Sequence, residues 1–183
     1  MNNNQYPSWD EIVNLREEFR DSYWAYWINE NLFSFGWFLQ FGLNILFIYI
    51  AYKLLDRTRL FELLTAGGII AILSSLLDSI TIQNVLTTYP NSFTPISPPF
   101  VTSTVVILPI VYMLLYQFFS TWQSFIIANV ISGAILAFVI ENLFRWLDIY
   151  QYIQWNSFFS FIVYLVMAVI LKWIMNYLMK AQK

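Results

Sequence analysis

Five long apolar stretches constrain this chain more than any other feature of its sequence. Each stretch is close to the ~20 residues that an α-helix needs to cross the hydrocarbon core of a bilayer. They cover residues 32–54, 60–82, 100–119, 122–146 and 157–179. Only 11% of the 183 residues are charged and 59% are hydrophobic, whereas about a quarter of a soluble domain is charged. The sequence therefore predicts an all-α integral membrane protein built as a bundle of five transmembrane helices.

The segment before the first stretch predicts a separate N-terminal unit. Ser8 and Glu11 have the spacing of a capping box at a helix start. Aromatic residues, among them Trp9, Phe19 and Trp27, share one face of that helix, and acidic residues lie mostly opposite. We therefore expect residues 1–30 to form an amphipathic helix along the outer membrane surface. Residues 31–183 then form the transmembrane bundle.

The basic residues predict the orientation of the bundle, because cytoplasmic loops carry an excess of lysine and arginine. With five spans, six basic residues fall on one side and three on the other (Lys53, Arg57, Arg59, Lys172, Lys180 and Lys183 against Arg16, Arg20 and Arg145). The sequence thus predicts a multi-pass protein of the cell membrane, with its N-terminus outside and its C-terminus in the cytoplasm.

The residue types that the chain lacks narrow its chemistry. It has no cysteine and no histidine, which excludes thiolate catalysis and zinc sites built from these residues. We expect no cofactor. A net charge of −2 gives no reason to expect a nucleic-acid partner. The lipid bilayer is the partner that the composition does predict.

Residues 87–99, "TTYPNSFTPISPP", form the longest stretch that cannot be helical. Four prolines within ten residues favour extended, turn-rich backbone, and none of these residues is charged. Two interpretations stay open: a rigid connector on the membrane surface, or a lid folded over the outer mouth of the bundle.

Small residues recur every four positions along the second and fourth stretches. Positions four apart share one face of a helix, and stripes of small residues let helices approach closely in lipid. We therefore expect these two stretches to be neighbours, with small helix-packing residues on each (Gly67, Ala71, Gly133 and Ala137).

Each stripe ends near a carboxylate, Asp78 or Glu141. Both acids are expected in the outer half of the bundle, so we predict that they share a site with Arg145, to which Ser74, Ser75, Thr81 and Gln83 add hydrogen bonds. Acids inside a membrane are costly and are commonly functional. The alternative is a structural ion pair, because Glu141 and Arg145 lie four residues apart near the end of a span.

The order of several short motifs resembles that of a known family. The motifs include "LDRTRLFELL", "LLDSI", "YPNSFTPISPP", "LPIVYMLLYQFFSTWQSF" and "FVIENLF". Together they resemble small multi-pass membrane proteins of spore-forming Gram-positive bacteria, over nearly the whole chain. The resemblance implies a helical membrane protein of unassigned activity in a bacterial plasma membrane, with a link to sporulation. It implies no catalytic residues.

Two functions from different classes follow from these observations. The first is binding or passage of a small polar solute or cation at the acidic site, in a chain short enough to favour a homo-oligomer. The second is a structural or partner-binding role, in which the aromatic N-terminal helix docks another membrane component. An enzyme is the third choice, because the acids lie in "LLDSI" and "VIENL", which are not intramembrane protease motifs.

Overall fold

The computed structural model describes residues 6–96 and 101–181 of the chain. The end of the proline-rich segment, residues 97–99, and Phe100, expected to open the third stretch, lie outside the described residues. The helices are α1 (Trp9–Tyr26), α2 (Phe35–Leu54), α3 (Leu60–Gln83), α4 (Leu108–Phe118), α5 (Trp122–Ile135), α6 (Glu141–Trp146) and α7 (Ser157–Ala181). Two short strands, β1 (Thr87–Thr88) and β2 (Gln151–Tyr152), form an antiparallel pair. The all-α prediction is confirmed.

Four helices are long and apolar enough to cross a membrane. They are Phe35–Leu54, Arg57–Gln83, Trp122–Trp146 and Ser157–Ala181. The third predicted stretch forms a shorter apolar helix, Thr102–Phe118. Among the described residues, four helices therefore have spanning length, and the fifth predicted span is not confirmed.

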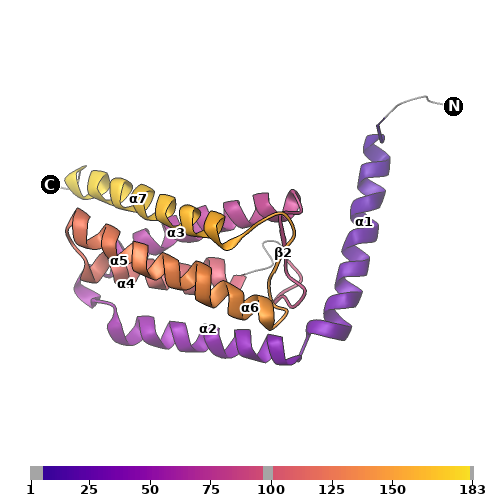
Figure 1. Ribbon diagram of the computed structural model, residues 1–183, viewed down its shortest axis with the longest axis horizontal. Helices are drawn as coiled ribbons and strands as arrows, with labels where there is room; N and C mark the ends of the chain where they lie inside the picture. The colour runs from indigo at the N-terminus through magenta and orange to yellow at the C-terminus, as the bar shows by residue number, and fades with distance from the viewer. Residues whose placement is uncertain (1–5, 97–100, 182–183) are drawn as a thin grey trace.

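The long helices lie side by side, and α1 runs crosswise at one end of them (Figure 1). We call this end the cavity end, because a cavity lies there. It also carries the loops at residues 84–96 and 147–156. The opposite end carries the α2–α3 connection, the α4–α5 connection and the end of α7, and we call it the C-terminal end (Figure 1). The basic residues of the α2–α3 connection and of late α7 thus share one end, as their spacing predicted.

The bundle is apolar both inside and outside. Its central core includes fully buried Leu63, Ile70, Phe125 and Leu171. Large apolar side chains such as Ile72 are also exposed along the outer faces of the helices. A water-soluble protein rarely exposes so much apolar surface, so this distribution fits a bundle surrounded by lipid.

The two small-residue stripes do not pack on one another, which corrects the predicted pairing of the second and fourth stretches. A methyl group added at Gly67 would lie 2.7 Å from the sulfur of Met113, so Gly67 gives α4 room to approach α3. Gly133 faces Phe161 and Tyr164 of α7 instead. Sequence spacing identifies close-packing positions, but it does not identify their partners.

The other two stripe residues differ in burial. Ala137 is fully buried, as a packing residue should be. Ala71 is only half-buried. The small-residue face of α3 therefore turns away from the core beyond Gly67.

Two helices that border the cavity contain wider π-helical turns, η3 (Thr102–Ile107) before α4 and η4 (Leu136–Ile140) before α6. In a π turn the amide of residue 109 would bond the carbonyl of residue 104, but Pro109 has no N–H. That carbonyl accepts a hydrogen bond from the Ser74 hydroxyl at 2.9 Å instead. Proline thus diverts a backbone acceptor to the neighbouring helix, α3.

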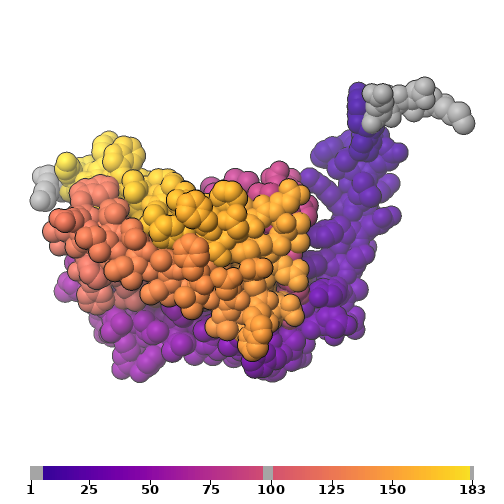
Figure 2. All heavy atoms as spheres, in the orientation of Figure 1, coloured from indigo at the N-terminus to yellow at the C-terminus, as the bar shows by residue number. Residues whose placement is uncertain are grey.

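The N-terminal helix begins as its sequence predicted. Ser8 and Glu11 form both hydrogen bonds of the capping box. The helix continues into a π-helical turn, η1 (Trp27–Asn31), and so ends one residue beyond the expected range of 1–30. Its first turns stand away from the bundle (Figure 2), whereas Tyr23 and Trp27 bond to the loop at the cavity end.

Candidate functional site

A cavity of about 100 Å³ lies inside the bundle near the cavity end. Its walls come from α3, η3, η4, α6 and α7, and from the two loops that cover this end. Asp78 and Glu141 both line it, so the structure brings together the two acids that were expected to share a site. The lining side chains among the described residues include these two carboxylates and no lysine or arginine.

Glu141 is buried and is held by two tyrosines. It is the first residue of α6, directly after the π turn η4, and it is 8% exposed. The Tyr164 hydroxyl donates to Oε1 at 2.5 Å, and the Tyr152 hydroxyl donates to Oε2. Both partners are neutral phenols, so they orient the carboxyl group without supplying a positive charge.

Asp78 is held in a similar way. It is 7% exposed, on the last turns of α3. The hydroxyl of Tyr89, in the loop that follows, donates to its Oδ1. Each acid therefore faces the cavity with at least one tyrosine fixing its carboxyl group.

Arg145 does not form the predicted pair with Glu141. Among the described residues the ion pairs are Arg20–Asp21 and Arg59–Glu62. The Arg145 guanidinium donates to Asn142 at 2.9 Å and lies 4.4 Å from the ring centroid of Tyr152. Its charge reaches Glu141 only as a longer-range electrostatic interaction, so the interpretation of a direct structural ion pair is wrong.

Two of the four predicted hydrogen-bonding residues lie at the cavity and two do not. Ser74 and Thr81 line it, and the Thr81 hydroxyl donates to the Asp78 carbonyl. Ser75 is half-buried and its carbonyl accepts a bond from Ser79. Gln83, the last residue of α3, is exposed and is not part of the lining. A helix rotates by about 100° per residue, so a shift of one position moves a side chain off the face.

A cluster of loop tyrosines covers the cavity. Strands β1 and β2 pair Thr87 with Tyr152, which fixes the two loops together. The Tyr89 and Tyr150 rings stack with their centroids 5.2 Å apart, and the Tyr150 ring meets that of Tyr152 edge to face. These residues were not singled out from the sequence, because they are brought together only when residues 84–96 and 147–156 meet.

The loop tyrosines are hydrogen-bond donors over a wide pH range. Burial and the Glu141 charge raise the pKa of Tyr152 to about 12. Burial also raises the pKa of Tyr150, and burial with the Asp78 charge raises that of Tyr89 well above its ordinary value. All three phenols therefore stay protonated at neutral pH.

The described part of the proline-rich segment is fastened to both N-terminal helices. Trp27 donates to the Ser92 carbonyl at 3.0 Å, and the Tyr23 hydroxyl shares a hydrogen bond with that of Ser92. From α2, Gln40 donates to the Asn91 carbonyl at 2.9 Å. Tyr89 of this segment also lines the cavity. The described residues of the segment therefore cover the bundle as a lid would, and these hydrogen bonds hold them in place.

A second hollow lies outside this cover. It has a volume of about 410 Å³ between α1 and the proline-rich segment, and we call it the α1 groove. Its walls include Phe19, Tyr23 and Pro95. Tyr89 lines both the α1 groove and the acidic cavity, so this one side chain lies between them.

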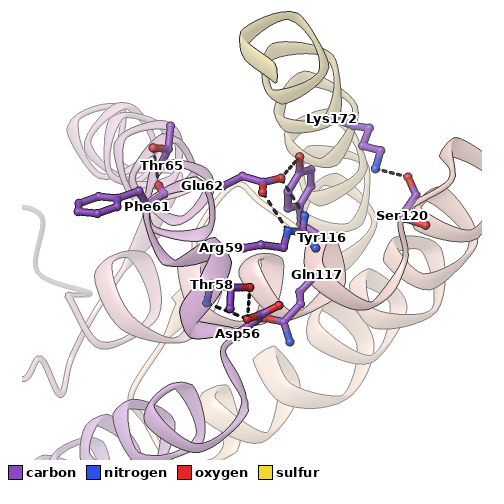
Figure 3. Close-up of polar contacts among 10 residues, drawn as sticks. All are labelled: Asp56, Thr58, Arg59, Phe61, Glu62, Thr65, Tyr116, Gln117, Ser120 and Lys172. Carbon is purple, nitrogen blue, oxygen red and sulfur yellow. Dashed lines mark hydrogen bonds and ion pairs between the residues drawn. The ribbon is translucent and has the colours of Figure 1, made fainter. Parts of the chain in front are cut away.

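A separate polar cluster lies at the C-terminal end (Figure 3). Glu62 accepts two hydrogen bonds from Arg59, at 2.8 and 2.9 Å, and a third from the Tyr116 hydroxyl. Lys172 is buried, donates to the Ser120 carbonyl at 2.8 Å and lies 4.9 Å from the Tyr116 ring centroid. The three-residue spacing of Arg59 and Glu62 was the only sequence signal for this cluster.

The comparisons with known proteins add no family to this description. No protein-family model matches the chain, no curated protein matches it, and no solved structure matches it. The chemistry of the cavity has to come from its own residues.

Proposed function

We propose that this protein is a multi-pass membrane protein that binds a small cation in the acidic cavity and passes it on. The observation that carries this proposal is a cavity whose lining includes two buried acidic residues and no basic side chain of the described residues. An ionised carboxyl group away from water is costly unless a positive charge balances it. A bound cation, or a proton that it displaces, supplies that balance.

The phenols hold the Glu141 carboxyl group in a fixed orientation for a ligand. Tyr152 and Tyr164 hold both oxygens of Glu141 in place. A carboxylate oxygen has two lone pairs, and each phenol uses one. Acceptor capacity therefore remains on Glu141 for a ligand.

The access route in this proposal runs past Tyr89, because that side chain lies between the cavity and the α1 groove. On the inner side, Leu108 and Met167 line the cavity, and Leu63, Ile70 and Leu171 fill the core beyond it. An apolar core of this kind holds a bound ion back. Passage of the cation then requires a second arrangement of the helices.

The proposed topology has five spans, with Thr102–Phe118 as the third, the N-terminus outside and the C-terminus in the cytoplasm. It is supported by the basic residues gathered at the C-terminal end and by the acidic cavity at the other. In this arrangement α1 lies along the outer surface. A homo-oligomer in a bacterial plasma membrane, with a link to sporulation as the resemblance implies, belongs to the same proposal.

A partner-binding role is the second candidate, and the exposed start of α1 favours it. Trp9 is 70% exposed and Phe19 is 69% exposed. Deleting residues 1–26 should remove a co-purifying membrane protein under this alternative, while the bundle survives. If nothing purifies with the full-length chain, the alternative fails.

The cation proposal is tested with purified protein in liposomes. Wild-type protein should take up or bind at least one ion from a panel of Na⁺, K⁺ and small ammonium ions. Glu141→Gln should reduce this ion uptake or binding by more than about tenfold, because the amide keeps the size of the side chain and removes its charge. Glu62→Gln, at the other end, is the matched control and should leave it nearly unchanged.

Two results would count against the proposal. Wild-type liposomes that match empty liposomes for every ion, together with no saturable binding, would overturn it. Equal losses in the Glu141 and Glu62 variants would point to general damage and not to the cavity.

A further inference from the structure

The walls of the acidic cavity indicate which kind of cation it takes. This inference rests on the proposed function. Besides the two acids, the lining carries aromatic rings from helices and loops (Tyr89, Phe144, Tyr150, Trp155 and Tyr164). Aromatic rings attract cations through the negative charge on their faces, and cages of such rings are the usual sites for organic ammonium ions.

The oxygen atoms of the cavity are poorly suited to a bare metal ion. Calcium takes six to eight oxygen ligands, and magnesium demands a near-octahedral set. Within the described residues, no group of three or more acidic side chains could hold a metal ion. The oxygens of Glu141 are also held by phenol donors, and close coordination of a metal would break those bonds.

An alkylammonium ion makes smaller demands. Its N–H groups donate to the remaining lone pairs of a carboxylate, and its methyl groups pack against rings such as Phe144 without any fixed geometry. The Glu141–phenol bonds can stay intact. The site thus offers hydrogen-bond acceptors to the N–H groups of such an ion and aromatic rings to its methyl groups.

The volume limits the size of the ion. The cavity measures about 100 Å³, which is smaller than the ~150 Å³ apolar cavity known to accommodate benzene. A methylammonium-sized ion fits this space. Tetramethylammonium is a poor candidate, because it has no N–H donor and is bulkier.

We propose that the acidic cavity binds a small primary or secondary alkylammonium ion, between the Asp78 and Glu141 carboxylates and the surrounding aromatic rings.

The first test uses wild-type protein in lipid nanodiscs and radiolabelled methylammonium as the probe. Binding should saturate, dimethylammonium should compete, and Na⁺, K⁺ and tetramethylammonium at the same concentration should not. If Na⁺ or K⁺ binds in a manner that depends on Glu141 and methylammonium does not compete, the alkylammonium inference is overturned and the cation site remains. If no ion binds at all, both fail.

The second test examines the rings. Phe144→Leu removes a ring from the wall but no hydrogen-bonding group, and it should weaken methylammonium binding about 3- to 10-fold. Phe138→Leu is the matched control, because Phe138 is 45% exposed and is not a lining residue. Equal affinities in the two variants would overturn the role of the rings, and thermal unfolding of each variant checks that it folds.

Discussion

The two ends of the bundle use the same residue types in opposite ways. At the C-terminal end, the Glu62 carboxylate meets a tyrosine and also two nitrogens of Arg59 (Figure 3). At the cavity end, the Glu141 carboxylate meets two tyrosines, and no described lysine or arginine forms an ion pair with it. The first acid is neutralised where it stands. The second has no such ion pair, and in the proposed function a bound cation takes that place.

The difference has a physical cause in the helix positions. Arg59 precedes Glu62 by three residues, so both reach one spot at the start of α3. Arg145 follows Glu141 by four residues, but Tyr152 lies against its guanidinium and Asn142 accepts its hydrogen bond. An arginine about one helical turn from a glutamate therefore forms a salt bridge at one end of the bundle and none at the other.

The sharpest test of this contrast compares one tyrosine at each end. Tyr164→Phe should lower the free energy of unfolding by about 2 kcal/mol, because it leaves a buried Glu141 oxygen without its donor. Tyr116→Phe should lower it by about 1 kcal/mol or less, because Glu62 keeps both bonds from Arg59. Thermal or denaturant unfolding in detergent measures both.

A larger loss of unfolding free energy in Tyr116→Phe than in Tyr164→Phe would contradict this expectation. That result would mean that the C-terminal cluster stabilises the bundle as a unit, and that the Glu141 carboxyl tolerates the loss of a donor.

A smaller effect should come from the cover of the cavity. A methyl group at Gly36 would lie 3.0 Å from Cγ of Asn91, whose side chain is already bonded to Ser34. Gly36→Ala should therefore cost about 1 kcal/mol and loosen the proline-rich segment. Gly42→Ala is the control, because no atom lies within 4 Å of a methyl group there.

The readout for this pair is unfolding together with limited proteolysis at the proline-rich segment. Faster cleavage in the Gly36 variant and an unchanged rate in the Gly42 variant are expected. Equal cleavage in both would show that the Asn91 contact does not hold the cover.

A further effect should appear at alkaline pH. The folded-state pKa of Tyr152 is about 12, above the value of about 10 for an unfolded tyrosine. Its protonated form therefore contributes stability that is complete below pH 10 and is lost as the pH rises through 12. Tyrosinate absorbance should develop at higher pH in folded protein than in protein unfolded by SDS, and Tyr152→Phe should reduce the absorbance that develops near pH 12. A folded titration that overlies the unfolded one would contradict this.

Much of the architecture was predictable because it depends on local sequence. The length of apolar stretches predicts helices, and the capping box at Ser8 and Glu11 forms as its spacing requires. Asp78 and Glu141 were recognisable as a site because acids are conspicuous in apolar helices. Their common cavity followed from equal depth in neighbouring parts of the bundle.

The errors came from contacts between distant segments. Gly67 packs on α4 and Gly133 on α7, although their similar stripes predicted that they would face one another. Ser74 and Thr81 line the cavity as predicted, but Ser75 does not, and Gln83 is exposed. Helix rotation and helix order decide such contacts, and neither is contained in the spacing of residues along one helix.

The sequence by itself determined that this chain forms apolar helices, with two acids at one end and most basic residues at the other. Hydrophobic length and charge distribution are properties of single segments, which is why they can be read without a fold. Only the tertiary structure decided that phenols from Tyr152 and Tyr164, and not Arg145, hold Glu141. These contacts join loops and helices that are far apart in the chain, so they depend on how the loops pack on the bundle.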